Sequence, residues 1–443
     1  MADIKKDYLK EYDNVAEAQK FSLVKKWMET EPLPFFKQLR EQRPILVTPL
    51  CTLVSHFNDV RDVLQMPKIF TVALYKSKMG DYLMTHDDNA VHDREKAIMQ
   101  SMLNRDDIPF VREVVARNAR QILDTANGQI EAAYNYCRAV PASLVQDYFG
   151  FDCVEKKDLI EWSYWTQYDS FHNHFFNLLS EKETQYFSNQ KEEMSKKFTM
   201  YMTGLILRRT VAVKANQAVG FILCAWFFLL KIGHRLMGSD KYELKDDIVT
   251  RMISTSYSEA LEYPIARLGL NAGGLLIGAI ETTSQAVAQV IQMLLEKPEL
   301  TAMAVEAARK ENTDEFDAIV WEALRFVPIA PFLFRQTASA YTLAKGTDHE
   351  TAIPAGTNVL ALTQSAMFDA YAFENPDEFI PKRNWYHHFN FGFGSHECLG
   401  KYVGMVMIPE MVRQIFLMSN IKAESKINYK EGPFPEEYFL SWK

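Results

Sequence analysis

Cysteine, the residue that a disulfide-linked protein requires, is scarce in this 443-residue sequence. Its five cysteines stand at positions 51, 137, 153, 224 and 398, an odd and widely spaced set with no Cys-x-x-Cys pair and no cluster with histidine. Such spacing makes neither a disulfide framework nor a structural zinc site. We therefore expect a reducing compartment and place the protein in the cytoplasm.

The sequence also lacks an apolar leader. Residues 1–7 read Met-Ala-Asp-Ile-Lys-Lys-Asp, which is too charged for a signal peptide or an anchor helix. The most apolar run, residues 218–230, would rise only about 20 Å as a helix, against the roughly 30 Å of a bilayer core. We expect no transmembrane span. Three interpretations of this run remain open: a buried helix, an oligomer contact, or an edge that dips into a membrane surface.

An excess of positive charge is missing as well. Lysine and arginine total 49 against 57 aspartates and glutamates, a formal net charge of −8. A balance of this sign gives no general attraction to nucleic acid, so no nucleic-acid partner is expected. The apolar content of 48% is that of a globular protein with a large interior.

What the sequence does contain is a glycine-studded loop, Phe391-Gly-Phe-Gly-Ser-His-Glu-Cys-Leu-Gly400, ahead of an apolar helical run over residues 401–419. Gly394 and Gly400 permit backbone angles and close approaches that a side chain would block. Peptide N–H groups and the positive end of the following helix favour a thiolate at Cys398. The alternative is that Cys398 is a buried apolar filler.

Read as Phe-x-x-Gly-x-His-x-Cys-x-Gly, the loop resembles the haem-binding loop of cytochrome P450s. The resemblance implies that Cys398 is the axial thiolate ligand of the iron of haem b, that His396 meets a haem propionate and that Phe391 belongs to the cofactor site. It further implies a mainly helical fold with small β-sheets. We expect a single domain over residues 1–443, with a helix and small-sheet region over 1–85 and a helical haem-binding core over 86–443.

A second signal lies in residues 268–295, a stretch of helical character whose only charge is Glu281. Its polar residues make it a poor membrane span, so we expect one helix that crosses the core. Gly278-Ala-Ile-Glu-Thr-Thr283 resembles the oxygen-activation segment of P450s. In this interpretation Thr282 orders a water at the oxygen site and Glu281 links that site to bulk protons. The alternative is that Thr282 bonds back to the Gly278 carbonyl and Glu281 faces a polar partner.

Basic residues at three further positions extend the resemblance. His92 and Lys96 are one helical turn apart and share a face, where the family holds haem propionates with a histidine and a basic residue. Lysine in place of the common arginine is a departure, since it offers a point charge and not a planar fork. Arg335 stands where another propionate-binding arginine is expected. The alternative for His92 and Lys96 is an exposed, charged helix start.

An acidic residue and two arginines predict a structural cluster. Glu322-Ala-Leu-Arg325 gives Glu-x-x-Arg, and Arg383 lies just ahead of the cysteine loop. Glu-x-x-Arg alone is a weak signal, because any solvated helix can show it. The resemblance implies that Glu322, Arg325 and Arg383 form a buried ionic cluster that holds the haem loop.

Together these motifs predict a P450 monooxygenase. The expected reaction inserts one oxygen atom from O2 into a C–H bond of an apolar small molecule such as a fatty acid, terpenoid, steroid or aromatic ether. Electrons would come from a separate ferredoxin or flavodoxin-type donor. Two rivals stay open: a haem-thiolate isomerase, dehydratase, lyase or peroxygenase that uses hydroperoxides or peroxide, and a non-catalytic haem-binding sensor.

Overall fold

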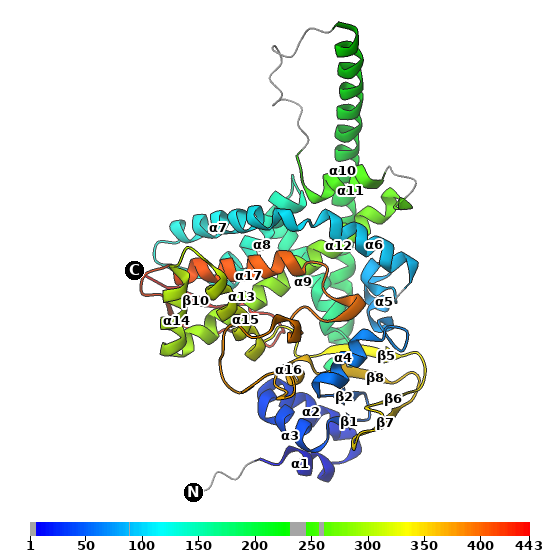
Figure 1. Cartoon of the computed structure of the whole chain (residues 1–443), viewed down its shortest axis with the longest axis vertical. Helices are drawn as coiled ribbons and strands as arrows, with labels where there is room; N and C mark the ends of the chain where they lie inside the picture. Colours follow the sequence, from blue (N-terminus) through cyan, green and yellow to red (C-terminus); the bar gives the residue numbers. More distant parts are fainter. Residues whose placement is uncertain (1–5, 88, 231–244, 257–260) are drawn as a thin grey trace.

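The computed structural model describes residues 6–87, 89–230, 245–256 and 261–443, with the backbone alone for 216–230. Figure 1 shows a large helical body and, at the end near the N-terminus, a smaller part in which short helices surround the strands. The predicted class, mainly helical with small sheets, is confirmed.

Helices dominate the described residues. The α-helices are α1 (Tyr8–Asn14), α2 (Glu17–Thr30), α3 (Pro32–Gln42), α4 (Phe57–Gln65), α5 (Ala73–Met79), α6 (Ala90–Met102), α7 (Ile108–Thr125), α8 (Ala139–Leu144), α9 (Lys156–His172), α10 (Glu181–Leu230), α11 (Ile248–Ser256), α12 (Ile265–Ala279), α13 (Glu281–Glu296), α14 (Pro298–Ala308), α15 (Asp314–Phe326), α16 (Thr363–Ala366) and α17 (Lys401–Phe416). Shorter helical turns that matter below are η1 (Leu83–Thr85), η3 (Ala133–Arg138), η4 (Val145–Phe149) and η9 (Gly394–His396).

The main sheet has five strands in the order β1-β2-β8-β5-β3. These are β1 (Ile45–Val47), β2 (Thr52–Val54), β3 (Phe70–Thr71), β5 (Leu333–Thr337) and β8 (Asn358–Ala361). β2 and β8 are parallel with Leu53 opposite Leu360, and β5 and β8 are antiparallel with Arg335 opposite Val359. The sheet therefore joins the first part of the chain to a segment that lies far along it.

Two smaller sheets complete the strands. One has the order β4-β10-β9 and consists of β4 (Gln129–Glu131), β10 (Phe439–Ser441) and β9 (Lys422–Ala423); the other pairs β6 (Tyr341–Leu343) with β7 (Thr351–Ile353). Residues 353–357 connect β7 of the small sheet to β8 of the main sheet.

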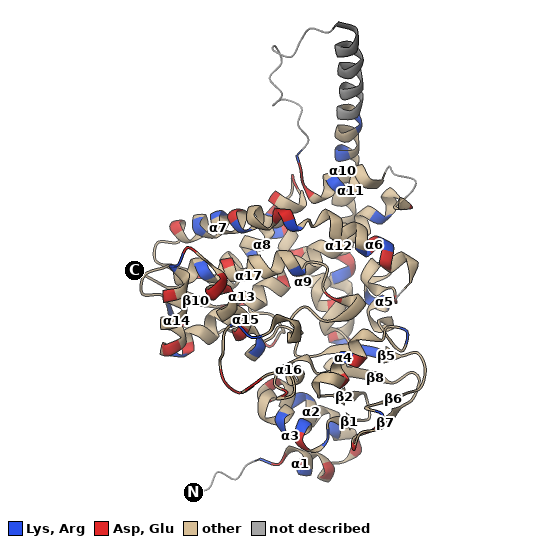
Figure 2. Ribbon diagram, viewed as in Figure 1, with Lys and Arg blue, Asp and Glu red and all other residues tan. Residues whose placement is uncertain are grey.

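The helical core is built around α13 and α17. α17 packs on α7, α13 and α15, and these helices lie together in Figure 1. α13 is buried on nearly all sides, and Ala286, Val287, Val290, Ile291 and Leu294 are at most 1% exposed, as in a helix surrounded by protein. Figure 2 shows that positions with Lys, Arg, Asp and Glu are spread along the outer helices such as α7.

The expected continuous helix over 268–295 is divided. α12 ends at Ala279 and α13 begins at Glu281, with Ile280 (φ −90°, ψ −66°) between them. A residue at these angles departs from regular helix geometry, and the break falls beside the Glu281-Thr282 pair. The sequence has no proline to mark such a break, and both halves pack in the same core.

No helix of the described residues combines the length and the apolar character that a membrane crossing requires. The backbone of residues 218–230 belongs to α10. Its side chains are not among those described. A buried helix, an oligomer contact and an edge that dips into a membrane surface therefore all stay open for this run.

Candidate active site

The cysteine loop is held in place by its own backbone and by α4. Gly392 and Gly394 adopt positive φ angles of 72° and 74°, which favour glycine. A Cβ at Gly394 would lie 2.9 Å from the Leu64 carbonyl oxygen of α4. The Cys398 N–H donates to the Phe391 carbonyl at 2.8 Å. The glycine at 394 thus lets the loop rest directly on the α4 backbone.

Cys398 lies at the end of this loop, three residues before the first residue of α17, Lys401. Its side chain is accessible, yet burial by the surrounding protein raises the pKa of its thiol, as expected on the wall of an interior space. The Gly400 N–H and the charges of Lys96 and Lys401 act in the opposite direction and lower this pKa. These contacts favour the thiolate, whereas burial and the charge of Glu397 oppose it.

Arg335 is a buried cation without an ion pair among the described residues. It is 4% exposed on β5, and its one hydrogen bond of normal geometry goes to the Phe334 carbonyl. Burial lowers its pKa, while the nearby Tyr75 and Asp87 raise it. A buried guanidinium with free donors favours an anionic ligand.

His396 of η9 is a second buried group that lacks partners and favours an anionic ligand. Within the described part of the chain neither ring nitrogen makes a hydrogen bond of normal geometry, although a looser approach to the Met84 backbone exists. Burial and the charges of Arg335, His92 and Lys96 lower the pKa of His396 to about 3. The Oγ of Ser395 is likewise buried without a partner among the described residues.

His92 and Lys96 hold the cysteine loop from α6. The Asn89 side chain caps this helix by accepting from the N–H groups of Val91 and His92, as an N-cap residue does. His92 is 1% exposed, and its ring centre lies 4.6 Å from that of His396, with the two rings tilted by 44°. Its ring nitrogens lie 3.0 Å from the carbonyls of Leu83 and Ser395.

The Lys96 ammonium donates to the carbonyls of Ser395, at 2.5 Å, and Glu397, at 2.8 Å. An ammonium has three donors, so one is left over. The start of α6 is therefore a buried support of the cysteine loop, in contrast to the alternative of an exposed, charged helix start.

These residues fit a haem. The unpartnered nitrogens of His396 and the unpaired guanidinium of Arg335 are donors that two propionates would satisfy. The positive charges of Arg335 and Lys96, which lower the pKa of His396, would be neutralised by the same propionates. An accessible sulfur on the same loop completes the donor set.

Glu322, Arg325 and Arg383 come together as one buried ionic cluster. Arg325 donates to both carboxylate oxygens of Glu322 at 2.8 and 3.0 Å, and Arg383 donates to Oε1 at 3.0 Å. Arg325 also donates to the carbonyls of Met367, Pro376 and Glu378. This one side chain thereby fixes the path of the segment that leads to the cysteine loop.

Glu281 is fully buried on the first turn of α13 and has a partner that the sequence did not suggest. The Arg138 Nε donates to both of its carboxylate oxygens at 3.0 Å, and the other Arg138 nitrogens donate to Glu436 at 3.2 and 3.3 Å. Glu436 is 22% exposed. The guanidinium therefore connects a sealed carboxylate to one at the surface. An arginine alone among the apolar residues of 132–149 was the available signal, since buried charge requires a partner.

Thr282 follows Glu281 and is half-buried. Its hydroxyl donates to the Gly278 carbonyl at 2.6 Å, and a Cβ at Gly278 would meet nothing within 4 Å. The hydroxyl therefore makes the backbone hydrogen bond that the alternative interpretation of Thr282 expects. It lies next to open space on the same face of the helix.

Tyr82 is a further residue that sequence patterns did not single out. It packs on α12 at Gly274, where a Cβ would lie 2.2 Å from its ring. Burial, and then the proximity of Cys398, raise its pKa. Tyr82 therefore lies between α12 and the cysteine loop.

Comparison with known proteins agrees with this geometry. The family model described as cytochrome P450 matches residues 51–424. The chain belongs to the cytochrome P450 family. Members of this family bind haem b through a cysteine thiolate.

Curated P450 relatives match over part of the chain. Cytochrome P450 105A3 of Streptomyces carbophilus is 30% identical over 142 residues, which is 32% of each chain. Vitamin D3 dihydroxylase of Streptomyces griseolus is 32% identical over 127 residues, 29% of each chain. These matches span about a third of the length of the relatives.

Solved P450 structures match nearly throughout. The structure of CYP109Q5 from Chondromyces apiculatus has a TM-score of 0.72 at 18% identity and covers 94% of this chain and 96% of that one. CYP109E1 from Bacillus megaterium, in complex with testosterone, has a TM-score of 0.72 at 17% identity and covers 94% and 99%. The predicted P450 fold is confirmed.

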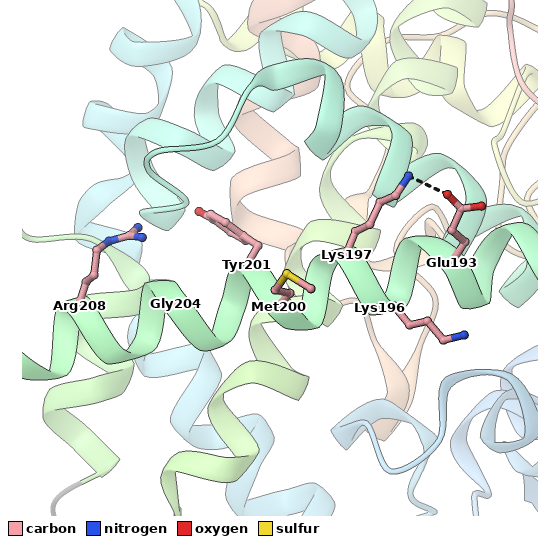
Figure 3. Close-up of a pocket in the computed structure, with 7 residues that line it drawn as sticks. All are labelled: Glu193, Lys196, Lys197, Met200, Tyr201, Gly204 and Arg208. Carbon is pink, nitrogen blue, oxygen red and sulfur yellow. Dashed lines mark ion pairs between the residues drawn. The ribbon is translucent and has the colours of Figure 1, made fainter.

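An open hollow on the α10 surface is separate from this site. Figure 3 shows the residues that line it, which all come from one helix: Glu193, Lys196, Lys197, Met200, Tyr201, Gly204 and Arg208. Glu193 and Lys197 form an ion pair at 2.8 Å across one turn. None of the residues discussed above belongs to it.

Proposed function

We propose that this P450 is a monooxygenase that inserts one oxygen atom from O2 into a C–H bond of an apolar small molecule. The observation that carries the proposal is the buried Arg335 guanidinium and the unpartnered His396 ring beside an accessible cysteine on a glycine-shaped loop. The Glu281-Thr282 pair at the break between α12 and α13 supports oxygen activation in preference to isomerisation.

In this proposal Cys398 would supply the thiolate ligand of haem b, Arg335 and His396 would bind the propionates, and Phe391 would pack beside the cofactor. His92 and Lys96 orient the loop through its carbonyls, and the third Lys96 donor is free for a propionate. The bound haem supplies reductive activation of O2, with the thiolate promoting O–O cleavage.

The protein's own part is to exclude water and to deliver protons. Thr282 would turn its hydroxyl from the Gly278 carbonyl and hydrogen-bond a water beside the reacting oxygen. Burial raises the pKa of Glu281 to about 7, although Arg138 lowers it. A carboxyl that titrates near neutrality both takes up and releases protons, so Glu281 is suited to pass them inward.

The substrate is expected among fatty acids, terpenoids, steroids and aromatic ethers. The testosterone complex of one structural relative and the vitamin D3 dihydroxylase among the sequence relatives support the steroid-like end of this range. A spin-state titration of the ferric protein against such compounds would identify the class, because a ligand near the iron displaces bound water.

Electrons would come from a ferredoxin or flavodoxin-type donor. Arg105 is exposed and stacks 3.9 Å from the ring centre of Tyr402, on the first turn of α17 next to the cysteine loop. Such a cation suits an acidic donor. Arg105→Glu should slow reduction and weaken its salt dependence; an unchanged rate would place donor docking elsewhere.

The decisive experiment is carbon monoxide binding to the reduced protein. The wild type should show the red-shifted absorption typical of thiolate ligation, and Cys398→Ser should lose that band while the fold is retained by circular dichroism. Turnover with reductase and 18O2 should then place one labelled atom in the product. Labelled-oxygen insertion that is absent, together with reductase-free turnover of a fatty-acid hydroperoxide, would identify an isomerase or lyase instead.

A further inference from the structure

Away from the haem site, two histidines and an aspartate converge between α4 and the turn that joins β6 to β7. His56 precedes the first residue of α4, Asp59 lies in its first turn, and His349 comes from the β6–β7 turn. One ligand atom from each side chain lies within 4.8 Å of the others. Asp59 is 6% exposed, so its carboxylate is nearly sealed from water.

The second nitrogen of each histidine is already engaged. His56 Nε2 lies 2.9 Å from the Arg40 carbonyl, so it carries the proton and leaves the Nδ1 lone pair facing Asp59 Oδ2 at 3.8 Å. His349 Nδ1 lies 3.0 Å from Asp348 Oδ1 and 3.1 Å from the Thr347 hydroxyl. With the proton on Nδ1, Nε2 presents its lone pair to the same Asp59 oxygen at 3.0 Å. Histidines that bind metal ions show this arrangement, with the outer N–H donated to a carbonyl or a carboxylate.

In the tautomers that place the protons on the outer ring nitrogens, the inner atoms of the cluster are all acceptors, which suits a cation between them. A metal ion with bonds of about 2.0–2.1 Å needs ligand atoms about 3.3 Å apart in a tetrahedron, which lies within the range of the separations seen here.

We propose that His56, Asp59 and His349 bind a divalent transition-metal ion of the Zn²⁺ type. Two imidazole nitrogens and one carboxylate oxygen suit this class, and water completes the tetrahedron. The side chains of His56 and His349 are 30% and 18% exposed, which gives the ion a path from solvent. The open fourth position makes the ion exchangeable.

The bound ion acts as a clamp. It ties the β6–β7 turn to the start of α4, a nine-residue helix whose last residues, Leu64 and Gln65, support Gly394 of the cysteine loop. Metal binding at this cluster requires no substrate and no redox partner, so it does not depend on the proposed oxygenation.

The test uses the full-length, haem-loaded protein without a polyhistidine tag. Competition for Zn²⁺ against a chromophoric chelator should give one site per chain, and Zn²⁺ should raise the melting temperature. His349→Ala and Asp59→Asn should each weaken binding at least about tenfold, the lower end of what losing a supporting group of a metal site costs. The matched control is His86→Ala, because His86 pairs with Asp81 at 2.8 Å but has no second histidine in its cluster.

Zinc-edge X-ray absorption gives a readout that a folding defect does not imitate. The wild type should show a shell of nitrogen and oxygen with imidazole scattering and no sulfur. A sulfur ligand, or a stoichiometric site that survives in the His56→Ala, His349→Ala double variant, would overturn the assignment. Absence of stoichiometric Zn²⁺ binding to a correctly folded wild type would do the same.

Discussion

A single guanidinium, that of Arg138, is shared between one carboxylate inside the molecule and one at its surface. Removing one partner of a buried charge pair leaves the other charge unpaired, which is costly. The protonation of Glu281 is therefore coupled to the stability of the fold.

The stability of the protein should depend on the charge of Glu281. Burial raises its pKa from 4.5 to about 7. The folded state therefore holds this proton more tightly than the unfolded state. The resulting stabilisation is complete below the unfolded pKa and is lost as the pH rises toward 7. In Glu281→Gln the free energy of unfolding, measured with denaturant at pH 5 and pH 7, should fall less over this interval than in the wild type.

The control is Glu299→Gln, on the exposed first turn of α14. In this variant the free energy of unfolding should change between pH 5 and pH 7 by the same amount as in the wild type. An equal slope in Glu281→Gln would mean that this carboxyl does not retain its proton in the folded state.

Thr282 offers a second prediction at the level of one residue. Thr282→Ala removes the hydroxyl that now donates to the Gly278 carbonyl. Haem binding and substrate-induced spin shift should persist, while reducing equivalents pass to hydrogen peroxide because protons are no longer directed. The yield of product per electron pair measures this. Thr282→Ser should restore coupling, and full coupling in the alanine variant would remove the proposed relay.

Among the elements, the contact of α4 with the cysteine loop depends on the absence of a side chain at position 394. Gly394→Ala would combine a positive φ of 74° with a Cβ 2.9 Å from a backbone oxygen. The strained angle alone costs about 1–3 kcal/mol, and neither backbone yields easily. We expect a lower haem content and a lower melting temperature.

The matched control is Gly356→Ala. Gly356 has a φ of 78°, but a Cβ there would meet nothing within 4 Å. The angular strain is therefore the same and the steric conflict is missing. Equal losses of haem in the two variants would show that the contact with α4 is unimportant for the loop.

At the scale of the whole molecule, the main sheet bears on the expected single domain over residues 1–443. Because β2 pairs with β8, we infer that residues 1–85 and 86–443 unfold together. Melting followed by haem absorption and by far-ultraviolet circular dichroism should give coincident transitions. Leu53 has no exposed surface. Leu53→Ala should lower the two melting temperatures by the same amount and reduce the free energy of unfolding by about 2–5 kcal/mol. A haem transition that stays at the wild-type temperature would separate the two regions.

Sequence patterns predicted the fold class because they are local. The cysteine loop, Glu322-x-x-Arg325 and His92 one turn before Lys96 each lie within about ten residues of sequence. Arg138, Glu436 and Tyr82 were missed because their roles arise from contacts over long separations, such as the 143 positions between Arg138 and Glu281. The break at Ile280 was missed because residues 268–295 contain no proline that would mark it.

The order of the main sheet has a consequence for biosynthesis. Thr71 of β3 hydrogen-bonds to Gln336 of β5, 265 positions later. At translation rates of about 5–20 residues per second, the early strands leave the ribosome roughly 10 to 50 s before their partners. During that interval the free edge of β2 is open to pairing with other nascent chains, so production in cells should depend on chaperones that shield it.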